Sequence, residues 1–366
     1  MTTSADSGWT HAGHGRPESD EPEPTTMGIA TGLQLPKGFA SIAADADLGP
    51  AISMSLAKVE KQLHIAIANS DPLADATTRH LMEAGGKRIR PLLTLLAAQL
   101  GDASRPEVIQ AAVVVELTHL ATLYHDDVMD SAPYRRGAPT AHEVWGNTVA
   151  ILTGDLIFAR ASILVSELGA QALGIQARTF ERLCLGQLHE TVGPRPDQDP
   201  VEHYLSVIAD KTGSLVAASG QLGAIFAGVQ EPIQRVLVEY GEKAGVAFQL
   251  ADDVIDVTGL KQVSGKSPGT DLREGVSTLP VLLLRKAAAT DPSAAEVLAL
   301  VEGDLTSDDA LARAVAALQA HAVTAESWAI ARQWAEAAVD ALAPIPDGVV
   351  KSALVGFARA IVDRSA

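Results

Sequence analysis

The sequence predicts an all-α protein built as a single large helical bundle. Hydrophobic residues make up 47% of its 366 residues but aromatic residues only 4%. The core must therefore consist of Ala, Leu and Val, which suits closely packed helices. From about residue 50, apolar residues recur with the helical period almost without interruption. No run of alternating strand-forming residues joined by hairpin dipeptides stands out.

The N-terminal segment, residues 1–45, differs in composition from the rest of the chain. It is rich in Pro, Gly, Ser, Thr and acidic residues and lacks periodicity, so we expect a disordered or loosely attached tail. Residues 46–366 form the predicted helical domain. Turn-forming sequences divide this domain at four places: Ser131–Pro139, Gly193–Pro200, Gly259–Gly269 and Asp291–Pro292.

Two helical segments stand out within the domain. Pro106–Asp130 is long and apolar, and it follows a shorter helical segment at Pro91–Leu100. Thr212–Gln230 carries no charged residue and is long enough to span a bilayer. Because it contains four glycines together with Ser and Gln side chains, we interpret it as a buried helix at the centre of the bundle and predict no membrane span.

Composition also limits the function. Lys and Arg number 28 and Asp and Glu 45, which gives a formal net charge of −17. A surface this acidic repels phosphate backbones and argues against nucleic acid as a partner, although it leaves room for a local basic pocket. The one cysteine, Cys184, excludes an internal disulfide and a cysteine zinc site. A reducing cytoplasm is the simplest compartment.

An acidic motif ends the first apolar helix, with the sequence His125-Asp126-Asp127-Val128-Met129-Asp130. Asp126 and Asp130 are four residues apart, so they share a helix face about 6 Å apart along the axis. These carboxylates repel one another and oppose the helix dipole, a cost that a cation between them would offset. A site that supplies only a few carboxylate oxygens suits Mg²⁺, because this ion keeps several water ligands and also binds phosphate. The alternative is a solvated acidic helix end.

The same spacing recurs in Ala251-Asp252-Asp253-Val254-Ile255-Asp256, again at the end of an apolar helical run. Two such copies are hard to explain as unrelated acidic turns. Facing each other across a bundle, they would hold several Mg²⁺ ions and, through these ions, a diphosphate.

Basic residues accompany both acidic motifs. They lie in four segments: Gly85-Gly86-Lys87-Arg88-Ile89-Arg90-Pro91, Arg135-Arg136-Gly137, Lys211-Thr212-Gly213 and Gly265-Lys266. In so acidic a chain these cations could be neutralising ion pairs. Their placement in glycine-containing segments favours anion binding instead, because Arg forks match phosphate oxygens. Two separate basic groups allow two diphosphates, one bound through metal and one by cations alone.

Together these residues resemble the all-trans isoprenyl (polyprenyl) diphosphate synthases, most closely the long-chain bacterial members. The matching segments are Gly85–Pro91, Glu116–His119, His125–Asp130, Arg135–Thr140, Lys211-Thr212, Phe248–Asp256 and Gly265–Pro280. Class I terpene cyclases are similar at the first motif only. The resemblance implies an all-helical isoprenoid synthase fold around a central substrate cavity. It also implies Mg²⁺-dependent head-to-tail condensation of isopentenyl diphosphate with an allylic diphosphate.

The resemblance further implies a role for each matching residue. Three aspartates would ligate three Mg²⁺ ions on the allylic diphosphate, namely Asp126, Asp130 and Asp252, with support from Asp127, Asp253 and Asp256. The same diphosphate would be bound by Arg135, Lys211 and Lys266. The reacting centre would be lined by Thr212 and Gln249. Isopentenyl diphosphate would be bound without metal by Lys87, Arg90, His119 and Arg136.

Product length should depend on the residues just before the first acidic motif, because the growing chain must extend away from the metal ions between helices. Ala121 and Thr122 are small, whereas relatives with short products commonly have aromatic residues here. The resemblance thus favours a product longer than C20, in the range C35 to C50. The alternative is that Phe158 or Phe226 plugs the tunnel, which would stop growth at C15 or C20.

Other interpretations remain open at this stage. A non-catalytic subunit of a heteromeric synthase would be expected to lose acidic or basic elements, and this chain keeps them. A structural bundle with incidental metal sites would not explain the basic segments. The resemblance also implies a homodimer, but the sequence does not indicate which helices form its interface. The segment Gly186–Glu190 departs from the family pattern, so His189 and Glu190 have no assigned role.

Overall fold

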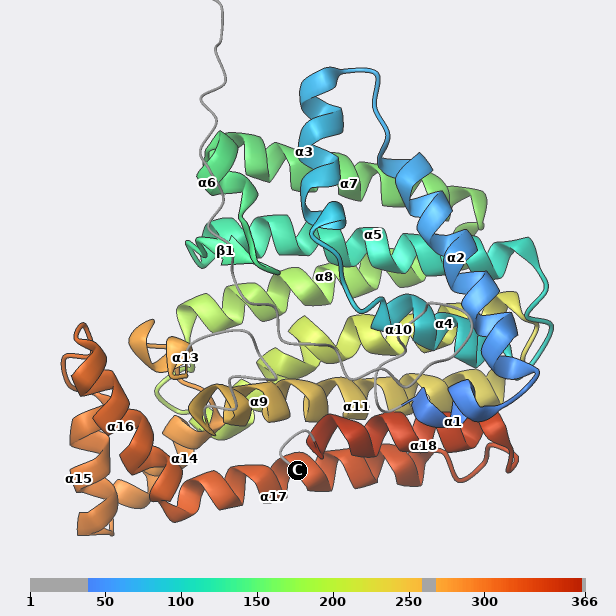
Figure 1. The fold of residues 1–366 in the computed structure, drawn as a ribbon. Helices are drawn as coiled ribbons and strands as arrows, with labels where there is room; N and C mark the ends of the chain where they lie inside the picture. The colour runs from blue at the N-terminus through green and yellow to red at the C-terminus, as the bar shows by residue number, and fades with distance from the viewer. Residues whose placement is uncertain (1–38, 259–267, 364–366) are drawn as a thin grey trace, which may run out of the picture. The chain divides into compact units, whose positions relative to one another are not determined.

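The computed structural model describes residues 39–258 and 268–363, and in these ranges it is helical apart from one short hairpin (Figure 1). This confirms the predicted all-α class. The elements, in chain order, are α1 (Ala40–Ala44), α2 (Leu48–Ile67), α3 (Pro72–Glu83), α4 (Ile89–Ala98), α5 (Pro106–Met129), β1 (Tyr134–Arg135), β2 (Ala138–Pro139), α6 (Ala141–Trp145), α7 (Asn147–Glu167), α8 (Ala170–Val192), α9 (Pro200–Ile208), the π-helical turn η2 (Ala209–Gly213), α10 (Ser214–Phe226), α11 (Glu231–Thr258), α13 (Thr270–Arg273), α14 (Leu279–Ala288), α15 (Pro292–Val301), α16 (Asp308–Ala320), α17 (Ala322–Ala341) and α18 (Val349–Val362).

Helices α5 and α11 carry the two acidic motifs and are joined by α10, which packs against both. α5 is further covered by α2, α4 and α7, and α11 by α17. Both helices end on the side of the bundle where β1 and α13 lie, so the two motifs come to the same end (Figure 1). Most of α10 is buried, which confirms that the uncharged segment predicted near the centre is a core helix.

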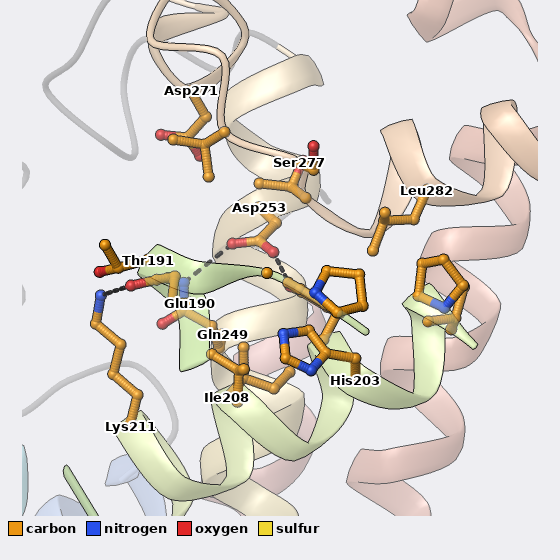
Figure 2. Close-up of a pocket in the computed structure, with 18 of the residues that line it drawn as sticks. Glu190, Thr191, His203, Ile208, Lys211, Gln249, Asp253, Asp271, Ser277 and Leu282 are labelled. Carbon is orange, nitrogen blue, oxygen red and sulfur yellow. Dashed lines mark hydrogen bonds and ion pairs between the residues drawn. The ribbon is translucent and has the colours of Figure 1, made fainter. Parts of the chain in front are cut away.

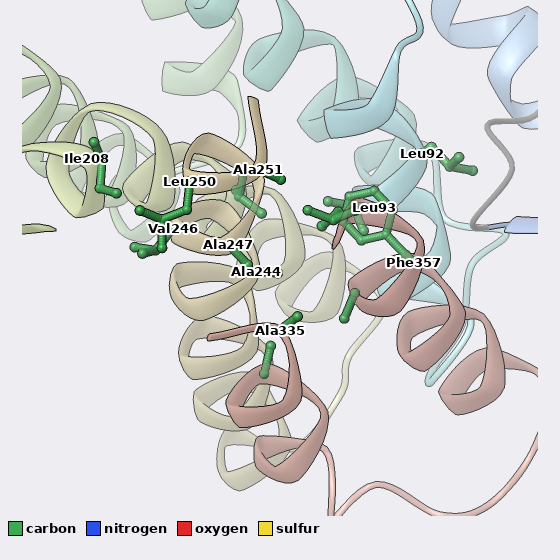
Figure 3. Close-up of a cluster of buried hydrophobic side chains, with 14 of the residues drawn as sticks. Leu92, Leu93, Ile208, Ala244, Val246, Ala247, Leu250, Ala251, Ala335 and Phe357 are labelled. Atoms are coloured by element: carbon green, nitrogen blue, oxygen red, sulfur yellow. The ribbon is translucent and has the colours of Figure 1, made fainter. Parts of the chain in front are cut away.

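Small side chains allow the core helices to pack closely. Ala244, Ala247 and Ala251 of α11 are fully buried, as is Ala335 of the neighbouring α17 (Figure 3). At Gly223 of α10 an added Cβ would lie only 2.1 Å from the carbonyl oxygen of Thr94 in α4. Backbones this close leave no room for a side chain, so the alanine-rich composition directly sets the helix spacing.

Three helices begin at an Asp-Pro pair, which explains several of the predicted breaks. Asp71, Asp199 and Asp291 cap α3, α9 and α15 by accepting hydrogen bonds from backbone N–H groups of the first turn. The following proline occupies the first helical position, where no N–H is needed. The breaks predicted at Gly193–Pro200 and Asp291–Pro292 therefore end where a new helix begins.

Two local expectations need correction. Residues 39–45 were predicted to belong to the loose tail, but Phe39 and Ile42 are fully buried and the Phe39 ring stacks on Phe357 at 4.8 Å. The helix that follows Phe39, Ala40–Ala44, is too short to show a helical period, so the sequence placed the boundary too late. The hairpin β1–β2 was also not predicted. Its two-residue strands are too short to alternate, and its turn, Arg136-Gly137, has positive φ at both residues.

In the described ranges, α5 and α7 are long and apolar enough to cross a membrane by length and composition. Burial against the neighbouring helices accounts for the apolar character of α5. α7 is less buried and exposes Leu152 and Ile163. The absence of a membrane span stays a prediction.

Candidate active site

The first acidic motif lies at the C-terminal end of α5. Asp126 is half-buried, and Asp130, the C-cap residue, is exposed. Burial raises the pKa of Asp126 to about 6, and the nearby Asp130 carboxylate adds to this while Lys211 opposes it. The raised pKa means that the positive charge near Asp126 does not offset the cost of burying its carboxylate. A bound cation would therefore stabilise the ionised form of Asp126. The oxygen-only donor set fits a hard divalent ion.

Asp127 occupies a different environment from its neighbours. Its side chain is buried and forms an ion pair with Nε of Arg135 in β1. Burial raises the pKa of Asp127, and the Arg135 guanidinium counteracts this. In this structure Arg135 therefore faces Asp127, and the pair connects the end of α5 to the hairpin.

The second acidic motif belongs to a hydrogen-bonded chain that crosses three elements. Thr212 of η2 donates to Oε1 of Gln249 at 3.2 Å, and Nε2 of Gln249 donates to Asp253 at 3.0 Å. The Tyr204 hydroxyl of α9 donates to the other oxygen of Asp253. Burial raises the pKa of Asp253 to about 8 despite these bonds. This chain fixes the rotamers of Thr212 and Gln249.

The remaining aspartates of this motif are half-buried. Asp256 accepts a hydrogen bond from the backbone N–H of Asp271 at 3.1 Å, which joins α11 to α13. Asp252 is the predicted metal ligand. Across residues 39–258 and 268–363, no three acidic, histidine or cysteine side chains are grouped closely enough to hold a metal by themselves.

Lys211 has a partner that the sequence did not indicate. Its Nζ lies 2.5 Å from a carboxylate oxygen of Glu190, at the end of α8 (Figure 2). Burial alone would lower the pKa of Lys211, but the carboxylates of Glu190, Asp126 and Asp130 outweigh it and raise the pKa. The lysine is thus firmly cationic, and Glu190, to which the sequence assigned no role, orients it.

These groups surround a cavity of about 1220 Å³. Its lining includes Met129 and Asp130 of the first motif and Asp253 of the second, together with Gln249, Lys211 and Thr212. Asp126 and Asp252 are not among the lining residues. The walls come from α8, α9, η2, α11, α13 and α14. One cavity therefore lies against both acidic motifs, at Asp130 of the first and Asp253 of the second.

A separate basic cluster lies on the N-terminal side of α4 and on α5. Arg88 pairs with Glu60 at 2.9 and 3.0 Å and with the buried Glu116 at 3.1 Å. Nε of Arg90 is buried and has no hydrogen-bond partner among the described residues. Burial lowers the pKa of Arg90, and Glu116 partly restores it. Arg88 thus anchors the loop, whereas Arg90 is left with an unused donor.

His119 lies within this cluster. Burial lowers its pKa well below the usual value, and the positive charges of Arg90, Arg136, Arg135 and Arg88 lower it further. The imidazole is therefore neutral. Four arginines therefore lie near one neutral histidine in a chain whose net charge is −17. This concentration of positive charge indicates an anion site.

Four further residues were predicted from the sequence, namely Lys87, Lys266, Ala121 and Thr122. Lys87 is exposed beside the basic cluster, and Lys266 lies outside the described residues. Ala121 is fully buried, and Thr122 donates to the carbonyl of His119 at 2.8 Å. Side chains therefore fill the space around Ala121 in this structure.

The two phenylalanines considered as plugs are half-buried. The Phe158 ring of α7 stacks on Phe180 of α8 at 3.8 Å, and Phe226 packs against the hydrophobic core.

Comparison with known proteins agrees with this geometry. The family model for polyprenyl synthetase matches residues 71–318. The chain belongs to the polyprenyl synthetase family. It is 42% identical over 333 residues to nonaprenyl diphosphate synthase of Mycobacterium tuberculosis, covering 89% of this chain and 98% of that relative. The chain is thus an all-trans polyprenyl diphosphate synthase and a prenyltransferase.

Two solved structures of the family are similar in fold. Polyprenyl synthase from Caulobacter crescentus, complexed with calcium and isoprenyl diphosphate, has 34% identity and a TM-score of 0.79, covering 87% of this chain and 97% of that one. Geranylgeranyl pyrophosphate synthase from Corynebacterium glutamicum, also complexed with calcium and isoprenyl diphosphate, has 41% identity and a TM-score of 0.78, covering 88% and 98%.

Proposed function

We propose that this chain condenses isopentenyl diphosphate with an allylic diphosphate in a Mg²⁺-dependent reaction to give an all-trans product longer than C20. The observation that supports this most is a single cavity lined by Asp130, Asp253 and Lys211, together with a separate arginine cluster around His119. This arrangement offers one site for each diphosphate. The calcium and isoprenyl diphosphate bound in two relatives support the same assignment.

The residues divide the work between the two substrates. Asp126, Asp130 and Asp252 would hold Mg²⁺, which when bound neutralises the leaving diphosphate. Because these carboxylates do not form a complete metal site by themselves within the described residues, the ion would also need oxygen ligands from the diphosphate and from water. Lys211 adds a fixed positive charge at the same leaving group.

The second diphosphate needs no metal in this proposal. Arg90 contributes an unused buried donor, and Arg136, Lys87 and neutral His119 complete the isopentenyl diphosphate site. The allylic C–O bond breaks, the isopentenyl double bond attacks the allylic cation, and a proton passes to the departing pyrophosphate. No side-chain nucleophile is required.

Linkage between metal and diphosphate tests the site without turnover. We expect Mg²⁺ and inorganic pyrophosphate together to raise the melting temperature, while Mg²⁺ alone changes it little. Binding at about 100 times Kd adds about 2.7 kcal/mol to the free energy of unfolding. Differential scanning fluorimetry with each component alone and both together gives the comparison. An equal rise with Mg²⁺ alone would mean an independent metal site and contradict the assignment.

The long product is supported by the small residues Ala121 and Thr122 and by the similarity to a nonaprenyl diphosphate synthase. A C15 or C20 product is the competing possibility, supported by the similarity to a geranylgeranyl pyrophosphate synthase and by the stacked Phe158 and Phe180. These two outcomes differ in product mass alone.

We also propose that two copies associate through α7 and α8. These adjacent helices expose several large apolar side chains, namely Ile151, Leu152, Ile163, Leu173, Leu185 and Leu188. Exposed apolar side chains on two adjacent helices, in a protein of otherwise acidic composition, favour a covered surface.

Charge on this face should separate the copies. We expect Leu152→Asp combined with Ile163→Asp to convert a dimer to a monomer in sedimentation velocity, because burying two carboxylates costs several kcal/mol. Leu300→Asp on α15, where the leucine is similarly exposed at 44%, is the control and should leave the dimer intact. A dimer that survives the double substitution would place the interface elsewhere.

A further inference from the structure

The π-helical turn η2 presents two site residues that are adjacent in sequence. Lys211 contacts Glu190, and Thr212 contacts Gln249. A π turn contains an extra residue, which rotates the following side chains relative to a regular helix, and such turns are often found at functional sites. Because π-helical geometry is less favourable than α-helical geometry, contacts with neighbouring elements must stabilise η2.

Helix α8 approaches η2 at backbone contact distance. A Cβ added at Gly186 would lie 2.9 Å from the backbone nitrogen of Lys211 and 3.2 Å from the carbonyl oxygen of Val207. On the opposite side, a Cβ at Gly245 of α11 would lie 2.6 Å from Cα of Gly213. The turn is therefore held between two helices at glycine positions, where neither side has space for a methyl group.

Arg182, one turn before Gly186 on α8, connects all three elements. Its Nε lies 2.7 Å from Asp210 of η2, and another nitrogen lies 2.5 Å from Glu242 of α11. A third nitrogen contacts the carbonyl oxygen of Ala209 at 3.4 Å. Asp210 directly precedes Lys211, so this ion-pair network fixes the start of the turn.

We propose that Gly186 and Arg182 are positioning residues that hold η2 so that Lys211 and Thr212 face the allylic diphosphate. The inference rests on the proposed function of Lys211. Neither residue touches the basic cluster, which lies on α4, α5 and the hairpin. Disturbing α8 should therefore weaken binding of the allylic substrate and leave isopentenyl diphosphate binding intact.

The test compares Gly186→Ala with Gly174→Ala, a glycine on the same helix whose added Cβ would meet only the flexible end of Arg178. We expect Gly186→Ala to raise KM for the allylic diphosphate about tenfold, since displacement of a positioned group by a fraction of an ångström is costly. KM for isopentenyl diphosphate should change less than about twofold. Gly174→Ala should change neither value.

Arg182→Met has its own control in Arg359→Met, which removes a bidentate pair with Glu336 far from η2. Arg182→Met should raise the allylic KM selectively, and Arg182→Lys should recover part of it by keeping the charge. Equal rises in both KM values, or no rise, would overturn the proposal for the residue concerned.

Amide hydrogen exchange separates failure of this inference from failure of the proposed function. Faster exchange in residues 209–213 of Gly186→Ala than of Gly174→Ala is expected whether or not the wild-type chain catalyses prenyl transfer. Unchanged exchange in that segment would overturn the positioning role even in an active enzyme.

Discussion

Asp126→Asn is expected to lower kcat for prenyl transfer by about 10³-fold, or about 4 kcal/mol of transition-state stabilisation. The Asp126 carboxylate would help hold the Mg²⁺ that neutralises the leaving diphosphate, and Asn is a much weaker ligand for a hard cation. Folding should not suffer, because burial raises the pKa of Asp126 to about 6, so its charge is unfavourable in the metal-free protein. Steady-state assays and thermal unfolding of the metal-free variant measure the two effects.

Asp155→Asn is the matched control. Asp155 is 61% exposed and pairs with His125, the residue before Asp126. Its substitution removes one negative charge from the same region without touching the proposed ligands. We expect nearly unchanged kcat. If Asp126→Asn retains activity within tenfold of the wild type, Asp126 does not serve as a metal ligand.

Ala121→Phe is expected to shorten the product from more than C30 to C20 or less. Ala121 lies on α5 five residues before Asp126, on the path that a growing chain would take away from the metal site. A phenyl ring there would block that path. Because Ala121 is already fully buried, the ring also overpacks the core at a cost of about 1–3 kcal/mol. Thr122→Phe, at a half-buried position, provides a second variant with less strain.

Product mass after extraction reports the change directly. Leu123→Phe, on the same turn of α5 and half-buried, is the control and should leave the product length unchanged. An unchanged product from both Ala121→Phe and Thr122→Phe would remove the role of these residues. A plug formed by the stacked Phe158 and Phe180 would then become the better explanation.

Local sequence signals predicted much of this molecule. The helical period located α5 and α10, and the acidic spacing located both motifs at helix ends on one side of the bundle. The break predicted at Gly193–Pro200 ends at the start of α9, where Asp199 and Pro200 act within one turn. These features depend on residues a few positions apart, which is the range over which sequence patterns are informative.

Contacts between distant segments were not predictable in the same way. Arg88 pairs with Glu60, 28 residues earlier, and Tyr204 reaches Asp253, 49 residues later. The segment that contains Glu190 departs from the family pattern, but the sequence assigned Glu190 no role. Only the fold shows that Glu190 contacts Lys211. Each partner depends on how helices cross, and no local spacing encodes that.

The most direct test of the account is the product of the purified chain acting alone. It is incubated with Mg²⁺, isopentenyl diphosphate and, separately, C10, C15 and C20 allylic diphosphates, and the products are identified by mass spectrometry. We predict a series of products that ends above C30. A series that stops at C15 or C20 would contradict the long product while keeping the reaction. Binding of both diphosphates without any condensation would contradict the central claim and indicate a non-catalytic subunit.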